Sequence, residues 1–201
     1  MSTRTTHGAG RLAIVIAGLL VACTGKSAEN PAPTPQVAMD QDRITLPPLQ
    51  RETASLSGTY AFIVAAEDRW QSARASGELL RVAGTRRTSA WKTSLPEQFG
   101  PRFVLLNEGG NVLLVDEWVN IVTRHALVLF DATGRERAHH TFDDIQTATG
   151  VPGSTIVQMA RYGAWLTSVP ALDEGGETAT FTVGGRTLSI SLADGHLSVI
   201  R

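Results

Sequence analysis

The strongest hydrophobic pattern lies between residues 101 and 142. Val112–Val115 and Leu127–Phe130 are continuous apolar runs, which are typical of strands buried on both faces. Each run has a weaker partner run across a glycine-bearing turn, at residues 107–111 and at Asp131–Gly134. The pattern predicts two successive β-hairpins at the centre of the fold.

Weaker alternation of apolar and polar residues on both sides of this centre predicts further antiparallel strands. They cover residues 60–64, 77–84, 88–95, 177–183, 187–192 and 196–200. The turns recur at no fixed spacing, and about ten strands are too few for a closed propeller of four-stranded blades. We therefore predict an all-β, antiparallel, hairpin-rich single domain over residues 51–201, arranged as a sandwich or as a partial stack of propeller-like blades.

The segment between the central and the last strands contains the one predicted helix. Thr141-Phe142-Asp143-Asp144 has the capping pattern Thr-x-x-Asp, with acidic residues where the helix N-terminus favours them. We expect a short helix over residues 143–148 that ends before Gly150. Residues 154–168 are apolar, and we interpret them as a pair of strands that turns near Tyr162-Gly163.

The first 22 residues have the layout of a secretory signal peptide. Arg4 and Arg11 lie in a basic start, and Leu12–Val21 is an apolar run too short for a transmembrane helix. The run ends in Leu20-Val21-Ala22-Cys23, which resembles the lipobox of bacterial lipoproteins. The alternatives are an ordinary signal peptide with an incidental cysteine, or an uncleaved membrane segment.

The lipobox resemblance implies that Cys23 becomes the first residue of the mature protein. Its thiol would carry diacylglycerol and its amino group a further acyl chain such as palmitate, and burial of each methylene contributes about 0.8 kcal/mol to membrane binding. Thr24 stands where an aspartate would favour retention at the inner membrane. The expected location is therefore the outer membrane, with the protein facing the periplasm.

Residues 23–50 are predicted to form a lipidated N-terminus followed by a proline-rich linker. This stretch contains Pro31, Pro33, Pro35, Pro47 and Pro48, five of the nine prolines of the chain. Such a composition favours an extended tether that would hold the β domain clear of the bilayer.

Charge and cysteine content narrow the classes of function. The net charge of the 201 residues is −1, and removal of residues 1–22 takes away two arginines and no acidic residue, which leaves −3. A weakly acidic chain argues against nucleic-acid partners. Cys23 is the only cysteine, so the chain has no internal disulfide.

A second resemblance covers residues 91–192, about half of the chain. The order of tryptophans, glycine turns and an Asp-x-x-Gly segment is similar to that of a group of uncharacterised exported bacterial proteins with propeller-like hairpins. The residues that carry it are Trp91, Pro101, Gly109-Gly110, Asp116-Glu117-Trp118, Leu127–Phe130, Asp131–Gly134, Phe142–Ile145, Trp165, and Leu192 with Asp194-Gly195. The resemblance implies a β-rich, blade-like fold, and it supplies no catalytic residues.

The best candidate site is Asp116, Glu117 and Trp118, together with His125. These residues lie between the two central hairpins, at strand ends where binding loops usually occur, and they could hold a sugar or a peptide. The alternative is that Trp118 caps the core while the two acidic residues face water. The adjacent His139 and His140 are possible metal ligands, but neighbouring strand residues point to opposite faces of a sheet. We therefore interpret both histidines as solvent-facing and predict neither a metal nor a cofactor.

These observations favour a non-enzymatic, lipid-anchored envelope protein that binds another envelope protein or a cell-wall component. No catalytic motif is present, and the serine after Gly153 lacks a nucleophile elbow. The alternatives are a hydrolase or glycan-processing enzyme that uses Asp116, Glu117 and His125, and a structural accessory subunit that pairs through an edge strand.

Overall fold

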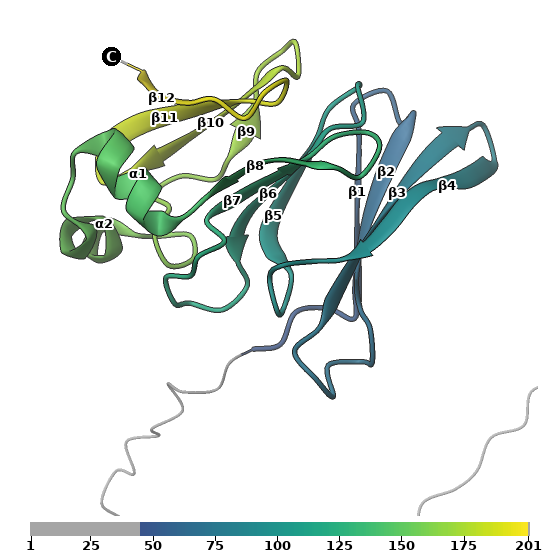
Figure 1. The fold of residues 1–201 in the computed structure, drawn as a ribbon, viewed down its shortest axis with the longest axis horizontal. Coiled ribbons are helices and arrows are strands. Elements are labelled where there is room, and N and C mark those ends of the chain that lie inside the picture. Colours follow the sequence, from purple (N-terminus) through teal and green to yellow (C-terminus); the bar gives the residue numbers. More distant parts are fainter. Residues whose placement is uncertain (1–44, 201) are drawn as a thin grey trace, which may run out of the picture. The chain divides into compact units, whose positions relative to one another are not determined.

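The computed structural model of the protein describes residues 45–200 (Figure 1). The predicted signal peptide, Cys23 and residues 24–44 of the predicted linker lie outside this range, so the expectations about them stay predictions. Within it, the chain forms twelve strands and two short helices.

The strands form three antiparallel sheets, each made of four strands that are consecutive in the chain. The first sheet contains β1 (Gln50–Ala54), β2 (Tyr60–Ala66), β3 (Ala75–Ala83) and β4 (Arg86–Ser94). The second contains β5 (Pro101–Leu106), β6 (Val112–Glu117), β7 (Leu127–Phe130) and β8 (Glu136–His140). The third contains β9 (Ala171–Leu172), β10 (Thr178–Val183), β11 (Arg186–Ser191) and β12 (Leu197–Ile200). The all-β, hairpin-rich prediction is confirmed, and each sheet has the neighbour-to-neighbour order of a propeller blade.

The second sheet is buried on both faces, as its continuous apolar runs predict. Leu113 and Leu127 on one face join a cluster with the third sheet, whereas Leu114 and Val128 on the other face join a cluster with the first sheet. All four side chains are fully buried. Because side chains alternate along a strand, β6 and β7 contribute to both cores at once, and each buried leucine stabilises the fold by roughly 2 kcal/mol.

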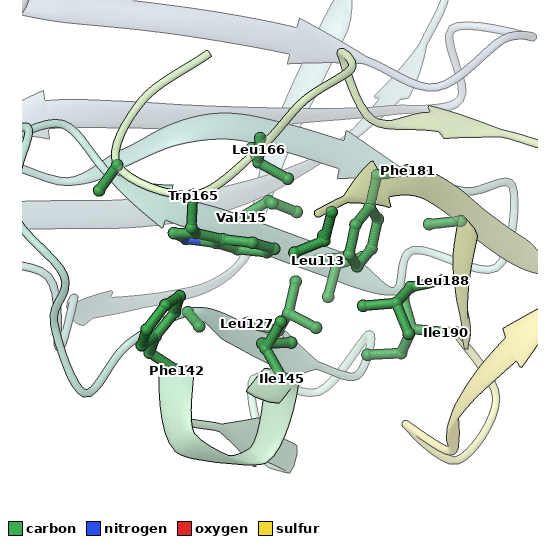
Figure 2. Packing of buried hydrophobic residues seen from close by; sticks show 14 of the residues in the cluster. Leu113, Val115, Leu127, Phe142, Ile145, Trp165, Leu166, Phe181, Leu188 and Ile190 are labelled. Carbon is green, nitrogen blue, oxygen red and sulfur yellow. The ribbon is translucent and has the colours of Figure 1, made fainter. Parts of the chain in front are cut away.

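The cluster shared with the third sheet is organised around Trp165. Its ring meets Phe181 edge to face, with the ring centroids 5.6 Å apart, and Ile145 of the first helix packs into the same cluster (Figure 2). The cluster shared with the first sheet contains three packed aromatic rings. The ring centroid of Trp91 lies 5.5 Å from that of Phe62 and 5.6 Å from that of Phe130. These two cores hold the second sheet between its neighbours.

Helix α1 (Phe142–Thr149) begins as the capping pattern predicts. The Thr141 hydroxyl accepts a hydrogen bond from the Asp144 backbone N–H, the Asp144 carboxylate accepts one from the Thr141 N–H, and Gly150 ends the helix with a φ of 65°. The predicted strand pair over residues 154–168 is wrong in its first part, which forms helix α2 (Gly153–Met159) after Pro152. The predicted turn near Tyr162-Gly163 is present, but only one isolated antiparallel bridge, between Tyr162 and Leu166, forms across it.

Candidate functional site

The four residues of the predicted site have different partners. Asp116 and Trp118 both contact Arg102 of β5, whereas Glu117 accepts a hydrogen bond from the Gln98 N–H and His125 contacts His139. Asp116 has a φ of 57°, which is rare for a residue with a side chain and marks a local change in the path of β6. The structure therefore joins Asp116 and Trp118 through Arg102 and gives Glu117 and His125 separate partners.

Asp116 is held in a closed environment, with 2% of its surface exposed. Its Oδ2 accepts hydrogen bonds from Arg102 Nε at 2.9 Å and from the Ala164 backbone N–H at 3.4 Å. Gly163 lies directly over this carboxylate, since a Cβ added there would overlap Asp116 Oδ2. Burial raises the pKa of Asp116 to about 6, and the hydrogen bond and charge of Arg102 oppose that rise.

Two arginines contact the indole ring of Trp118. The guanidinium carbon of Arg51 lies 4.8 Å from the ring centroid and that of Arg102 lies 5.7 Å from it, which is the range of cation–π contacts. Arg51 Nη1 donates to the Arg102 carbonyl at 3.1 Å, and Nη2 donates to the Pro101 carbonyl. Burial, and then the charge of Arg102, lowers the pKa of Arg51.

Trp118 also fixes the segment that precedes β1. Its Nε1 donates to the Thr45 carbonyl at 2.7 Å, and Trp70 Nε1 donates to the Pro47 carbonyl at 2.9 Å. β1 begins at Gln50, which the sequence assigns to the end of the linker. The last residues of the predicted linker are thus bound to the β unit by two indole N–H groups.

Glu97 is the buried acid that sequence reasoning misses. Its side chain has no exposed surface, and neither carboxyl oxygen has a hydrogen-bond partner among the described residues. Burial raises its pKa to about 8, and the charges of Glu117 and Glu136 act in the same direction. A segment that starts with a proline and ends with a glycine, as residues 96–100 do, is typical of an exposed turn. No pattern in the sequence therefore indicates that the Glu97 side chain is buried.

Glu117 and His125 have partners of their own. Glu117 is buried, with 4% of its surface exposed, and its Oε1 accepts a hydrogen bond from the Gln98 N–H at 2.9 Å. The expectation that Asp116 and Glu117 face water is wrong, because the turn of the chain at residues 96–100 and the segment at 163–165 cover them. Burial and the charge of His139 lower the pKa of His125.

The two adjacent histidines point to different neighbours, as strand alternation predicts. His139 Nε2 lies 3.0 Å from His125 Nδ1, and His140 Nε2 lies 2.8 Å from the Gly195 carbonyl. The expectation that both face solvent holds for His139, which is exposed, and only in part for His140, which is half-buried. In residues 45–200, no group of three or more His, Cys, Asp or Glu side chains is arranged to hold a metal ion.

A groove between β1 and β5 is the second site, and it has no counterpart in the sequence analysis. These edge strands of the first and second sheets lie side by side (Figure 1). A cavity of about 560 Å³ is lined by residues 51–53 of β1, by residues 102–105 of β5 and by Pro170. A cavity of about 350 Å³ continues from it and shares Thr53, Val104 and Leu105 with it.

The two ends of the groove differ in charge. Arg51, Arg102 and Glu52 line the first cavity, and Glu52 is paired with Arg87 at 2.8 Å. Glu108, Asp173 and Glu174 line the second. Leu56 stands at the second cavity with 95% of its surface exposed, which is unusual for a large apolar side chain beside a cavity. The groove therefore has a cationic end, an apolar middle and an acidic end.

Comparisons with known proteins do not assign a family. No protein-family model matches the sequence, and no curated protein matches it. Among solved structures, a europium-containing methanol dehydrogenase matches with a TM-score of 0.36 and 11% sequence identity, over 75% of this chain and 27% of that enzyme's chain. The chain thus spans about a quarter of that structure, and a likeness at this level carries no argument about fold or activity.

The helices of the described part are short. Neither α1 nor α2, nor any other helix within residues 45–200, has the length and apolar character that crossing a membrane requires.

Proposed function

We propose that the protein is a lipid-anchored protein of the bacterial cell envelope whose β unit binds an extended segment of another polypeptide, without catalysing a reaction. The lipobox at Cys23 supports the anchor, and Thr24 supports an outer-membrane location on the periplasmic side. The groove between β1 and β5 supports the binding role.

The observation that carries the binding role is the pair of edge strands that border the groove. Each edge strand presents backbone N–H and C=O groups along one side, and an extended peptide can add to such an edge. Residues 102–106 of β5 line the groove and span roughly 13 Å, which matches a peptide of about five residues. The exposed Leu56 adds apolar surface at one end.

The alternative proposal, a hydrolase or glycan-processing enzyme, receives less support from the geometry. Asp116 is engaged by Arg102 and covered by Gly163, and Glu117 is engaged by the Gln98 N–H. A general acid or base must come within hydrogen-bond reach of a substrate. The groove, by contrast, is open, and it is lined by other residues.

The anchor is tested by expression in a Gram-negative host of the wild-type chain and of Cys23→Ser. We expect the wild-type protein in the outer-membrane fraction, with the intact mass of the chain from Cys23 plus acyl groups, and we expect the serine variant to lack the acyl mass. A wild-type chain without acyl mass that fractionates as the serine variant does would refute the anchor.

The binding role is tested with the full-length protein in detergent and a pool of random hexapeptides, analysed by affinity selection and mass spectrometry. We expect selective retention of a subset of peptides and its loss in Leu56→Asp. Val157→Asp is the matched control, because Val157 of α2 is also exposed and lies outside both cavities. Retention that is equal in both variants, or absent from the wild type, would refute the groove as a binding site.

A further inference from the structure

The cationic end of the groove contains more positive charge than the described residues neutralise. Arg102 forms an ion pair with Asp116, at 2.9 Å. Arg51 makes its described hydrogen bonds to two backbone carbonyls, and no carboxylate of residues 45–200 forms an ion pair with it. Of the two guanidinium groups that line the first cavity, only that of Arg102 has a carboxylate partner among these residues, and the carboxylate of Glu52, which also lines the cavity, is paired with Arg87.

Both arginines retain N–H donors for a further acceptor. A guanidinium has five N–H donors in a planar fork. Arg51 uses Nη1 and Nη2 once each, and Arg102 uses Nε for Asp116 and Nη2 for the Trp118 carbonyl and the Asn120 side chain. The remaining donors suit a carboxylate, because Arg51 keeps N–H groups on neighbouring nitrogens that can form two parallel hydrogen bonds and Arg102 can add one from Nη1.

The arginines are held in place before any ligand arrives. Both guanidinium groups contact the Trp118 ring, and 18% of the Arg102 side chain is exposed. Side chains that are already fixed lose little conformational freedom on binding, so more of the interaction energy appears as affinity. The cationic end is thus a preorganised receptor for an anionic group.

The groove is closed at this end. Arg51 of β1 reaches across to the carbonyls of Pro101 and Arg102 at the start of β5, so its side chain bridges the two strands. A peptide that lies in the groove would meet this bridge. A chain terminus fits such a closed end better than a chain that continues through it.

The strand directions determine the orientation of a peptide that ends there. β1 and β5 both start at the cationic end, with Arg51 and Arg102, and both run toward the acidic end. A peptide with its carboxyl terminus at the arginines would run antiparallel to both strands. Antiparallel pairs are the more common arrangement of strands and are slightly more stable per residue.

The acidic end complements the other terminus of such a peptide. Glu108, Asp173 and Glu174 lie around the second cavity and favour a basic side chain or a free amino group. Leu172 lines the same cavity and Leu56 stands beside it, so an apolar side chain near the amino end of the peptide would contact them.

We infer that the groove binds the carboxyl-terminal segment of a partner polypeptide, about five or six residues long, with its α-carboxylate on Arg51 and Arg102 and its chain antiparallel to β1 and β5. This inference rests on the proposed function, since it names the partner segment that the groove would take. An internal acidic side chain at the arginines is the alternative that the experiment separates.

The test uses one random hexapeptide pool prepared in two forms, with a free terminal carboxylate and with a terminal amide that carries an isotopic label. The two forms are mixed in equal amounts and selected on the full-length protein in detergent. We expect the free-acid form of the retained peptides to be enriched about tenfold or more, because a charge-assisted bidentate contact is lost in the amide.

Two variants connect this preference to the cationic end. Arg51→Gln should retain the two forms about equally, whereas Arg186→Gln should keep the wild-type preference. Arg186 is a matched control because it is an exposed arginine on a strand, β11, and lines neither cavity. Circular dichroism of each variant checks that it is folded, and the comparison of the two peptide forms on the wild type requires no variant at all.

The outcomes separate the inference from the proposed function. Equal enrichment of acid and amide forms on the wild type, with peptides retained, would overturn the terminal carboxylate and leave peptide binding in place. If the wild type retains amidated peptides that contain an internal aspartate or glutamate, and Arg51→Gln does not retain them, the arginines bind an acidic side chain. That result would overturn the inference of a terminal carboxylate. Retention of no peptide would overturn both.

Discussion

Glu97 makes the stability of the protein depend on pH in a direction opposite to that of most surface carboxylates. Its side chain has no exposed surface and no hydrogen-bond partner among the described residues, and its pKa is raised from 4.5 to about 8. A raised carboxyl pKa means that the folded state binds the proton more tightly than the unfolded state. This stabilisation is complete below pH 4.5 and is lost as the pH rises through 8.

The size of the effect follows from the two pKa values. Each pH unit between them changes the free energy of unfolding by about 1.4 kcal/mol. Between pH 5 and pH 8, the contribution of Glu97 should therefore fall by about 3.5 kcal/mol. Glu97→Gln removes the ionisable group, so the variant should lose this part of the pH dependence even if its buried amide costs about 1–3 kcal/mol at every pH.

The assay is urea denaturation followed by tryptophan fluorescence at pH 5, 6, 7 and 8. The wild type and Glu97→Gln are compared, and Glu177→Gln serves as the matched control because Glu177 is exposed. The difference in unfolding free energy between wild type and Glu97→Gln should change steadily with pH, in favour of the variant as the pH rises. A difference that is constant from pH 5 to pH 8 would refute the reasoning that Glu97 is buried and protonated.

Three further predictions concern the packing around the second sheet. Gly163→Ala should lower the free energy of unfolding by about 3 kcal/mol, because the φ of 75° and the contact with Asp116 both oppose a Cβ. Gly84→Ala is the control: its φ is 61° but no atom lies near the new Cβ, so it should lower the free energy of unfolding by about 1 kcal/mol. Leu114→Ala should cost about 2–5 kcal/mol by chemical denaturation, because Leu114 is fully buried. Because burial raises the pKa of Asp116 to about 6, the free energy of unfolding of the wild type should fall between pH 4 and pH 6. This fall should be smaller in Asp116→Asn, which lacks the ionisable group. A wild-type stability that rises with pH in this window, and does so less in Asp116→Asn, would show instead that the ion pair with Arg102 outweighs burial.

Local patterns account for the parts of the fold that the sequence predicts well. The hairpins of the second sheet depend on apolar runs and on the turn at Asp131–Gly134, where the Gly134 N–H donates to the Asp131 carbonyl at 2.9 Å. The start of α1 depends on Thr141 and Asp144, three residues apart. Each of these features is decided by residues close in the chain, so a pattern in the sequence is sufficient to find it.

Long-range packing decides the features that the sequence does not predict. The groove exists because β1 and β5 come together, and Arg51 contacts Arg102 across 51 positions of the chain. The burial of Glu97 depends on how the segment around it packs. The sequence does not predict it, because a glutamate beside a proline is typical of an exposed turn. The first part of residues 154–168 belongs to α2 (Gly153–Met159) rather than to a strand, because a short apolar run fits both structures and only its neighbours decide between them.

The structure groups the four residues of the candidate site differently from the sequence, and their role in binding stays a prediction. Asp116 and Trp118 adjoin the cationic end of the groove through Arg102. The φ of 57° at Asp116 separates its environment from that of Glu117, and strand periodicity does not predict such a change.

The measurement that tests peptide binding in the groove most directly is amide hydrogen exchange of the full-length protein, with and without a peptide retained from the free-acid pool. Binding along the edge strands should slow exchange in Gln50–Ala54 and Pro101–Leu106, and exchange in α2 should stay unchanged. Unchanged exchange in both strands under saturating peptide, or protection confined to His125–His140, would contradict the account.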